Sequence, residues 1–307
     1  MKKKLILIIT LFLTTILLTG CTSYVKDKDK NVAQNEKTGQ KLVENILCQP
    51  EAKSTIEAYE KHKVNLKKLP KCNNFNITSG GYEGVWNTIF VKPLAWIIIL
   101  VKKIVSNTGL AIIIVTLLIR SLMIPVTKKA AVQSENLKKV QPELQKLEKK
   151  YKNKTDQESV MQKSQEMMIL YKKYDINPMS GCLFSFIQIP LFVAFYEALY
   201  RLPAVFEGNF LNFNLGNSPL IALSNNNPFY LIFPILVFIV TYYSFKLNSG
   251  ASMSPEQESQ MKTMRNISLV MIGTTSFSVS CAISLYWITN STFTILQNLY
   301  VKRIVVK

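Results

Sequence analysis

Arg120 is the residue of this 307-residue chain whose position most needs explaining. It lies within residues 109–125, an apolar run that carries no other charge and is long enough to cross most of a bilayer. An ionised side chain at membrane depth costs about 2.5 kcal/mol or more, so it normally faces a protein interior or a water-filled cavity. We therefore predict that Arg120 supplies a fixed positive charge for function. The alternative is an arginine near the cytoplasmic end whose head group extends to the interface.

Uncharged polar and amphipathic side chains occur in the same apolar segments as Arg120. Thr116 precedes Arg120 by four residues and Asn290 precedes Gln297 by seven, so each pair shares one face of a helix. If these faces converge, they enclose a polar groove around Arg120. The alternative is that each polar residue only hydrogen-bonds a neighbouring helix. The candidate groove residues are Arg120, Thr116, Gln188, Tyr286, Trp287, Asn290 and Gln297.

The sequence lacks the residue sets that covalent chemistry would need. Intramembrane proteolysis uses a serine with a base, paired aspartates or a metal with histidine ligands, and the apolar segments contain none of these sets. The chain has a single histidine, His62, with no ligand cluster around it, and no phosphate-binding glycine loop. We predict no enzymatic activity, no metal, no cofactor and no small-molecule substrate.

Composition predicts an all-α polytopic membrane protein. Hydrophobic residues make up 48% of the chain and gather in long blocks rather than in periodic stripes. The formal net charge is +18, and the lysines that produce it lie between these blocks. No aromatic-and-basic motif for nucleic-acid binding accompanies them. Anionic membrane lipids and cytoplasmic loops therefore explain the lysines better than nucleic acid does, apart from contact with a ribosome.

The first 83 residues are predicted to be an export region. Residues 1–20 have the basic start and apolar middle of a signal peptide and end in Leu-Thr-Gly before Cys21, which resembles a bacterial lipoprotein processing box with lipidation of that cysteine. The alternative is an uncleaved helix. Residues 21–83 are predicted to be an exported tether, in which residues 39–69 have helix-compatible spacing. The sequence leaves open whether Cys48 and Cys72 form a disulfide.

Residues 84–303 are predicted to form one membrane domain with five spans and a groove between them. Positive loop charges place the lipid-anchored N-terminus outside the plasma membrane and the C-terminus, residues 304–307, in the cytoplasm. A helix over residues 84–105, with Trp86 and Trp96 as interfacial aromatics, is predicted to lie on the outer surface. The predicted spans are residues 108–126, 178–200, 228–245, 267–282 and 283–300.

Residues 128–177 carry 12 lysines against 7 acidic residues and are predicted to be cytoplasmic. Their apolar residues recur at three-to-four-residue spacing on both sides of a break at residues 152–155, and Thr155 and Glu158 fit a capping box that restarts a helix. The segment is therefore predicted to be an antiparallel helical hairpin. Its lysines form either a solvated face, a docking surface for a cytosolic partner, or both.

The order of these elements resembles the YidC/Oxa/Alb family of membrane protein insertases, in its Gram-positive lipoprotein form. The most specific matches are the run from Gly109 to Ile113, Thr116 with Arg120, Gln141-Pro142-Glu143, Gln188-Ile189-Pro190, and Leu285-Tyr286-Trp287 with Asn290 and Gln297. The resemblance implies that Arg120 is the groove arginine, that Gln188 lines the groove, and that Tyr286 and Trp287 belong to the span that closes its other side.

The resemblance also implies the activity and partners. Nascent membrane proteins would be the clients, the Sec translocon and the ribosome would be partners through the hairpin, and one groove per chain would let a monomer function. The family's Pro-Ala-Gly-Leu is replaced here by residues 280–283 (Ser-Cys-Ala-Ile), and its methionine-rich fourth span with a proline is replaced by residues 264–268. This loss of proline and glycine is expected to straighten the last hairpin.

Two other functions compete with insertion. A small-anion transporter would use Arg120 as its binding charge, but the chain has neither an inverted repeat nor paired interrupted helices. Alternatively, the exported segment would be the functional part and the spans its anchor, for which five spans are more than needed.

Overall fold

The structure is a computed structural model that describes residues 22–154, 156–176, 180–248 and 255–306. The predicted signal peptide and lipidation site Cys21 lie outside this described part. The chain is mostly helical, as predicted, with one short pair of strands. It divides into two compact units, which are described separately: unit 1 (residues 22–116, 189–234 and 276–287 of those described) and unit 2 (117–188, 235–275 and 288–307).

Residues 22–83, predicted to be a tether with a small helical segment, are folded in unit 1, so the Lys/Asp run at residues 26–30 is not a solvated tether. Isolated β-bridges pair Lys26 with Val32 and Tyr24 with Val43. The Lys/Asp run between Lys26 and Val32 is a turn. In it, the Asp27 carboxylate accepts hydrogen bonds from the backbone N–H groups of Asp29 and Asn31 at 2.9 and 2.8 Å. An Asp side chain that satisfies nearby backbone donors in this way stabilises a turn.

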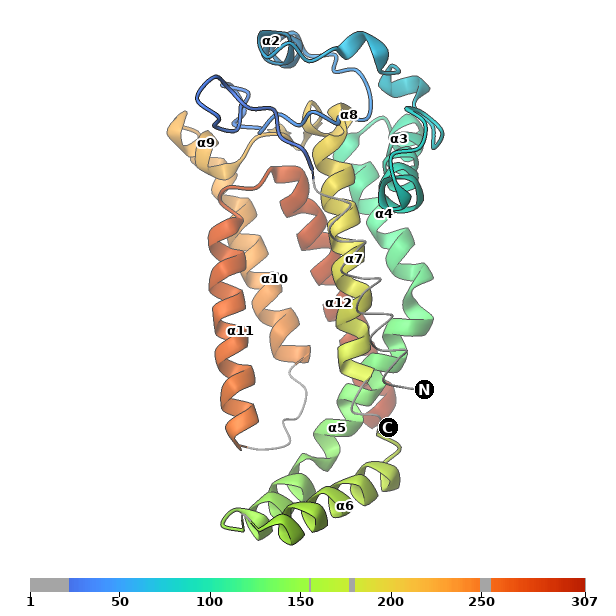
Figure 1. Ribbon diagram of the computed structural model, residues 1–307, viewed down its shortest axis with the longest axis vertical. Coiled ribbons are helices and arrows are strands. Elements are labelled where there is room, and N and C mark those ends of the chain that lie inside the picture. Colours follow the sequence, from blue (N-terminus) through green and yellow to red (C-terminus); the bar gives the residue numbers. More distant parts are fainter. Residues whose placement is uncertain (1–21, 155, 177–179, 249–254, 307) are drawn as a thin grey trace. The chain divides into compact units, whose positions relative to one another are not determined.

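Residues 22–83 contribute to a hydrophobic core of unit 1. Its buried side chains come from the extended segments, from helix α2 (Lys53–Lys61), from the end of α7 (Ser180–Arg201) and from the start of α12 (Cys281–Val306). They are Val25, Ala33, Leu42, Val43, Ile46, Tyr59, Tyr200 and Ile283. Of the stretch predicted to be helical, residues 39–69, only α2 is an α-helix, because Leu42 and Val43 pair with neighbouring extended segments instead. Figure 1 shows this segment in blue beside α8 and α9.

The structure has a disulfide between Cys48 and Cys72. It joins a bend at Cys48 to the short 3₁₀-helix η2 (Cys72–Asn74). Next to it, Gln49 forms a parallel bridge with Lys71. The disulfide therefore closes a loop that contains α2 and the 3₁₀-helix η1 (Leu66–Lys68).

The rest of unit 1 begins with the π-helix η3 (Asn87–Val91) and α3 (Lys92–Val105), so the helix predicted over residues 84–105 is largely present. Between α7 and α10 lie short elements: α8 (Pro203–Phe206), β1 (Asn209–Phe210), β2 (Phe213–Asn214), α9 (Pro219–Ser224) and η4 (Pro228–Leu231). Phe210 of β1 lies against α4 (Thr108–Leu122) at Gly109, where an added Cβ would lie 2.2 Å from the Phe210 ring. Gly109 is therefore required for this close approach.

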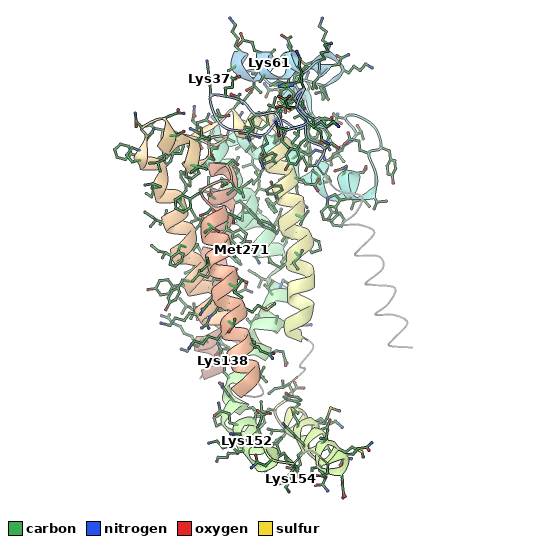
Figure 2. The ribbon with its side chains drawn as sticks, turned by 60° about the vertical axis from the view of Figure 1, so that its left-hand side comes forward. Lys37, Lys61, Lys138, Lys152, Lys154 and Met271 are labelled. Atoms are coloured by element: carbon green, nitrogen blue, oxygen red, sulfur yellow. A yellow bond between two sulfur atoms is a disulfide. The ribbon has the colours of Figure 1, made fainter. Side chains whose placement is uncertain are left out.

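Unit 2 contains the predicted hairpin, formed by α5 (Ile124–Tyr151) and α6 (Gln157–Lys173), which pack through Val140, Leu144, Tyr171 and Ile176. Asp156 caps α6 by accepting a hydrogen bond from the Ser159 backbone N–H at 2.8 Å, and Thr155 lies outside the described residues. Figure 2 shows Lys152 and Lys154 in the loop between the two helices.

The longer helices are α4 (Thr108–Leu122), α7 (Ser180–Arg201), α10 (Ile232–Asn248), α11 (Pro255–Thr275) and α12 (Cys281–Val306), some of which contribute to both units. α10 and α11 lie side by side in Figure 1 and expose many apolar side chains. Met271 of α11, labelled in Figure 2, is 58% exposed.

The predicted span over residues 267–282 has the wrong bounds. α11 starts at Pro255, ends at Thr275, and is followed by a turn. Hydrogen bonds with residues 217–220 hold the backbone of this turn and the start of α12: Leu220 N–H donates to the Phe277 carbonyl, and Cys281 N–H donates to the Asn217 carbonyl, both at 2.9 Å. Because these groups bond outside the helix, the turn is fixed without the family's proline and glycine.

Length and composition identify one helical segment among the described residues that can cross a membrane, Pro228–Leu247. The bent pair Thr108–Leu122 and Thr127–Tyr151 adds a second if it is counted as one span. α11 does not meet these criteria of length and composition, because its first half contains several charged residues. Five spans therefore stay a prediction.

Candidate functional site

Arg120 lies in the last turn of α4 and is buried, with 3% of its surface exposed. Its Nε donates a hydrogen bond to the Asn290 side-chain oxygen of α12 at 2.5 Å. An arginine inside an apolar segment must satisfy its donors within the protein. Asn290 is neutral, so this hydrogen bond orients the guanidinium and leaves its net charge unchanged.

A second polar pair joins the same parts of the chain seven residues further along. The Gln297 Nε2 donates to the Thr127 hydroxyl at 2.6 Å, and that hydroxyl donates to the Met123 carbonyl at 3.1 Å. Seven residues are about two turns of α12, so Asn290 and Gln297 lie on one face of that helix, whereas Arg120 and Thr127 lie on either side of the bend between α4 and α5. The structure thus brings Asn290 to Arg120 and Gln297 to Thr127, a residue that the sequence analysis missed although it lies seven residues after Arg120.

Gln188 of α7 also belongs to unit 2. Its side-chain oxygen is buried and has no hydrogen-bond partner among the described residues. A buried acceptor without a partner is uncommon in proteins and calls for an explanation. It is suited to receive a hydrogen bond from a bound polar group or from water.

The remaining predicted groove residues belong to unit 1. Thr116 is 1% exposed, and its hydroxyl donates to the Ile112 carbonyl of its own helix at 2.7 Å. Tyr286 is buried with its ring stacked on Phe195, at a centroid distance of 4.5 Å. Trp287 meets Phe192 edge-on at 5.0 Å. In unit 1 these aromatic residues thus join α12 to α7 by ring packing, and their grouping with Arg120 stays a prediction.

Sequence reasoning missed a buried ionic network in unit 1. Arg201, 1% exposed, donates to Asn87 at 2.6 Å and to Glu83 at 3.1 Å, and its Nη1 lies 3.7 Å from Glu197. The Trp86 indole N–H donates to Glu197 at 3.2 Å. Trp86 is 2% exposed, so its assignment as an interfacial aromatic is wrong. The four-residue spacing of Glu197 and Arg201 was the available sequence signal.

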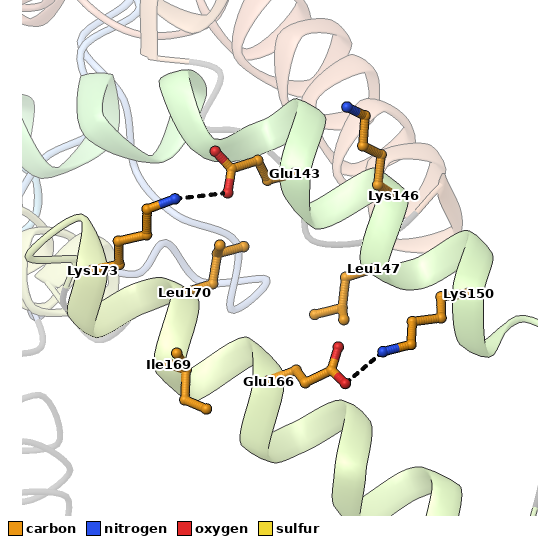
Figure 3. A pocket seen from close by; sticks show the side chains of 8 residues that line it. All are labelled: Glu143, Lys146, Leu147, Lys150, Glu166, Ile169, Leu170 and Lys173. Atoms are coloured by element: carbon orange, nitrogen blue, oxygen red, sulfur yellow. Dashed lines mark hydrogen bonds and ion pairs between the residues drawn. The ribbon is translucent and has the colours of Figure 1, made fainter.

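The hairpin of unit 2 carries charged pairs on its surface. Figure 3 shows Lys173 paired with Glu143, at 3.6 Å, and Lys150 paired with Glu166, at 2.6 Å, around a hollow of about 450 Å³ between α5 and α6. A hydrogen bond from Tyr174 and the Lys173 charge lower the pKa of Glu143. Hydrogen bonds from Lys150 and Tyr151 lower the pKa of Glu166. Each carboxylate thus bridges the two helices.

Residues 100–307 match the family described as the 60Kd inner membrane protein. A membrane protein insertase YidC from Oceanobacillus iheyensis is 37% identical over 226 residues, which are 72% of this chain and 85% of that protein. The membrane protein insertase MisCA of Bacillus subtilis is 36% identical over 218 residues, 71% of this chain and 79% of that protein.

The fold is similar to the crystal structure of an active YidC insertase with its first transmembrane domain resolved. The TM-score is 0.50 at 23% sequence identity, and the match covers 79% of this chain and 52% of that chain. The fold and the sequence matches together define a helical integral membrane protein. The chain belongs to the YidC family, as the sequence motifs indicated.

Proposed function

We propose that the chain is a membrane protein insertase. It would move the short polar flank of a nascent membrane protein across the bilayer and release the apolar segment into lipid. The observation that carries this proposal is the buried Arg120, held by Asn290 within segments that belong to an insertase family. The relatives at 37% and 36% identity are themselves named membrane protein insertases.

The proposed mechanism is electrostatic and needs no covalent step. A positive charge inside an apolar region attracts an acidic flank, and in a low dielectric this attraction is stronger than in water. Water drawn to Arg120 and to the buried Gln188 oxygen would shorten the apolar path that the flank must cross. The apolar client segment would then partition into lipid along α7 and α12.

The proposed topology has five spans, an exported lipid-anchored N-terminus and a cytoplasmic C-terminus in the plasma membrane. The exposed apolar side chains of α10 and α11 suit contact with lipid tails. The hairpin would be cytoplasmic, and its exposed loop lysines, Lys152 and Lys154, would suit docking to the ribosome or the Sec translocon. A monomer would be sufficient.

The test is depletion of the protein followed by protease accessibility of a single-span client with an acidic exported flank. Wild type is expected to restore insertion, Arg120→Lys to restore part of it, and Arg120→Ala to fail. A client with a neutral flank is the matched control and should depend less on Arg120. Equal rescue by wild type and Arg120→Ala would refute the charge-attraction mechanism while leaving insertion in place.

A second test separates insertion from small-anion transport by Arg120. Deletion of the hairpin, residues 128–177, should abolish client insertion. A transporter whose site lies between spans would largely tolerate the same deletion. Anion uptake by proteoliposomes that persists without the hairpin would therefore favour transport.

A further inference from the structure

Residues 45–52 of the exported segment are anchored to α7 and α8. Backbone and side-chain hydrogen bonds of 2.7 to 3.0 Å link this stretch to Arg201 and Glu207. They run from Arg201 Nε to the Asn45 carbonyl, from Leu47 N–H to the Arg201 carbonyl, and from the N–H groups of Glu51 and Ala52 to the Glu207 carboxylate. Arg201, in the last turn of α7, is thus held through both its side chain and its backbone carbonyl.

A second stretch, residues 73–83, is anchored to α3. The Lys92 ammonium is completely buried and donates to the carbonyls of Ser79 and Gly81 at 2.8 and 2.6 Å. Lys103 donates to the Asn73 carbonyl at 2.6 Å. A buried ammonium with several oxygen partners strongly favours the one backbone arrangement that supplies them.

Two links connect these anchors. The Cys48–Cys72 disulfide joins the stretches directly, and the Gln49 N–H donates to the Pro70 carbonyl beside it at 2.9 Å. Independently, the Glu83 carboxylate bridges the two helices, with one oxygen 3.1 Å from the Lys92 ammonium and the other 3.1 Å from the Arg201 guanidinium. α3 and the end of α7 are thus linked twice, once through hydrogen-bonded stretches that the disulfide joins and once through the Glu83 carboxylate.

We propose that residues 45–83 form a closed brace that fixes the Arg201 end of α7 against α3, with Glu83 as a positioning residue. The inference rests on the proposed function in one respect: α7 is a helix along which clients would leave, so a fixed end keeps its client-facing side in place. The brace lies before residues 100–307, the part that matches the family. It therefore adds to this chain a support for the shared membrane region.

Hydrogen–deuterium exchange of the full chain in detergent tests the brace without an insertion assay. Glu83→Gln removes the shared carboxylate and leaves the disulfide, whereas Cys48→Ser with Cys72→Ser removes the covalent link. Each variant should speed amide exchange in residues 197–207 by about tenfold or more, because removing one partner of a buried charge pair or a loop closure promotes local opening. Exchange in α5 and α6 should not change.

Glu57→Gln is the matched control, because Glu57 forms an exposed ion pair with Lys53 at 3.9 Å outside the brace contacts. Exchange in residues 197–207 that matches this control in both brace variants would overturn the proposal. If the double serine variant does not accumulate, Glu83→Gln decides alone. Faster exchange with unchanged client insertion would overturn the positioning role. Failure of wild type to insert any client would overturn the proposed function, while the exchange result would still decide whether the brace exists.

Discussion

The Arg120 guanidinium and the Asn290 carboxamide lie 2.5 Å apart although 170 positions separate them in the chain. One side chain is charged and the other is neutral, so the pair can be altered in charge while its shape is kept. Substitutions at Asn290 can therefore test the orientation of the Arg120 guanidinium separately from its charge.

Asn290→Asp is expected to reduce insertion of a client with an acidic flank and to preserve folding. The new carboxylate would still accept the Arg120 hydrogen bond, but it would neutralise the guanidinium that is proposed to attract the flank. Protease-protection assays would measure insertion, and thermal unfolding in detergent would measure stability. Asn290→Ala is the comparison, since it keeps the charge and removes its orientation. Full insertion by the Asp variant would show that net charge at Arg120 is not needed.

The Gln297–Thr127 pair is expected to contribute modestly to stability. Hydrogen bonds between membrane helices average about 0.6 kcal/mol in double-mutant cycles, because the separated helices find other partners. Gln297→Leu, Thr127→Val and the double variant should therefore give a coupling energy of about that size in detergent unfolding. Coupling that cannot be distinguished from zero would mean that the hydrogen bond adds nothing to helix association.

Gly109→Ala is expected to destabilise unit 1 by about 1–3 kcal/mol, the usual cost of overpacking. The added Cβ would lie 2.2 Å from the Phe210 ring, so the β1–β2 turn would have to move. Phe210→Ala in the same chain should recover part of the loss because it removes the obstructing ring. Thermal unfolding of the three variants measures this, and an unaltered melting temperature for Gly109→Ala would contradict the close contact.

Acid is expected to loosen the hairpin. The pKa values of Glu143 and Glu166 are lowered in the folded state by their Tyr and Lys partners. Their contribution to stability is therefore fully present above the ordinary carboxyl pKa of about 4.3 and is lost as pH falls through the lowered folded values. Exchange of α6 amides, corrected for the intrinsic pH dependence, should rise over this acidic range.

Glu143→Gln with Glu166→Gln supplies the control for the acid effect. This variant should show looser hairpin helices at neutral pH and a weaker dependence on acid. The same acid response in wild type and variant would assign the effect to other groups.

The hairpin and the family were predictable from sequence because their signals are local. Apolar spacing places Val140 and Leu144 on one face, and the polar break at residues 152–155 separates the helices. Arg120 stood out for a similar reason, as one charge in an apolar run. Its partner Asn290 was among the candidates, but no local rule pairs residues 170 positions apart.

Residues 22–83 were the main failure of the sequence reasoning, because their structure depends on distant contacts. Leu42 and Ile46 have helical spacing, yet both pack in a core that includes Tyr200 and Ile283. The charged residues 26–30 were interpreted as solvated chain, so the turn that the Asp27 carboxylate stabilises was not predicted. After α11 ends at Thr275, Phe277, Cys281 and Ala282 form hydrogen bonds with residues 215–220, contacts that no local pattern in the predicted span could indicate.

The buried network also changes how the charges of the exported side should be counted. In the proposed topology Lys92 and Arg201 lie on that side, where the positive-inside rule disfavours free cations. Both cations lie against carboxylates, Lys92 against Glu83 and Arg201 against Glu83 and Glu197. In the folded protein these carboxylates cover the ammonium and the guanidinium, so neither cation would be free to bind anionic lipid head groups on that side. Replacing Glu83 would leave both cations with fewer partners and would give the exported side a positive charge that the native protein keeps covered.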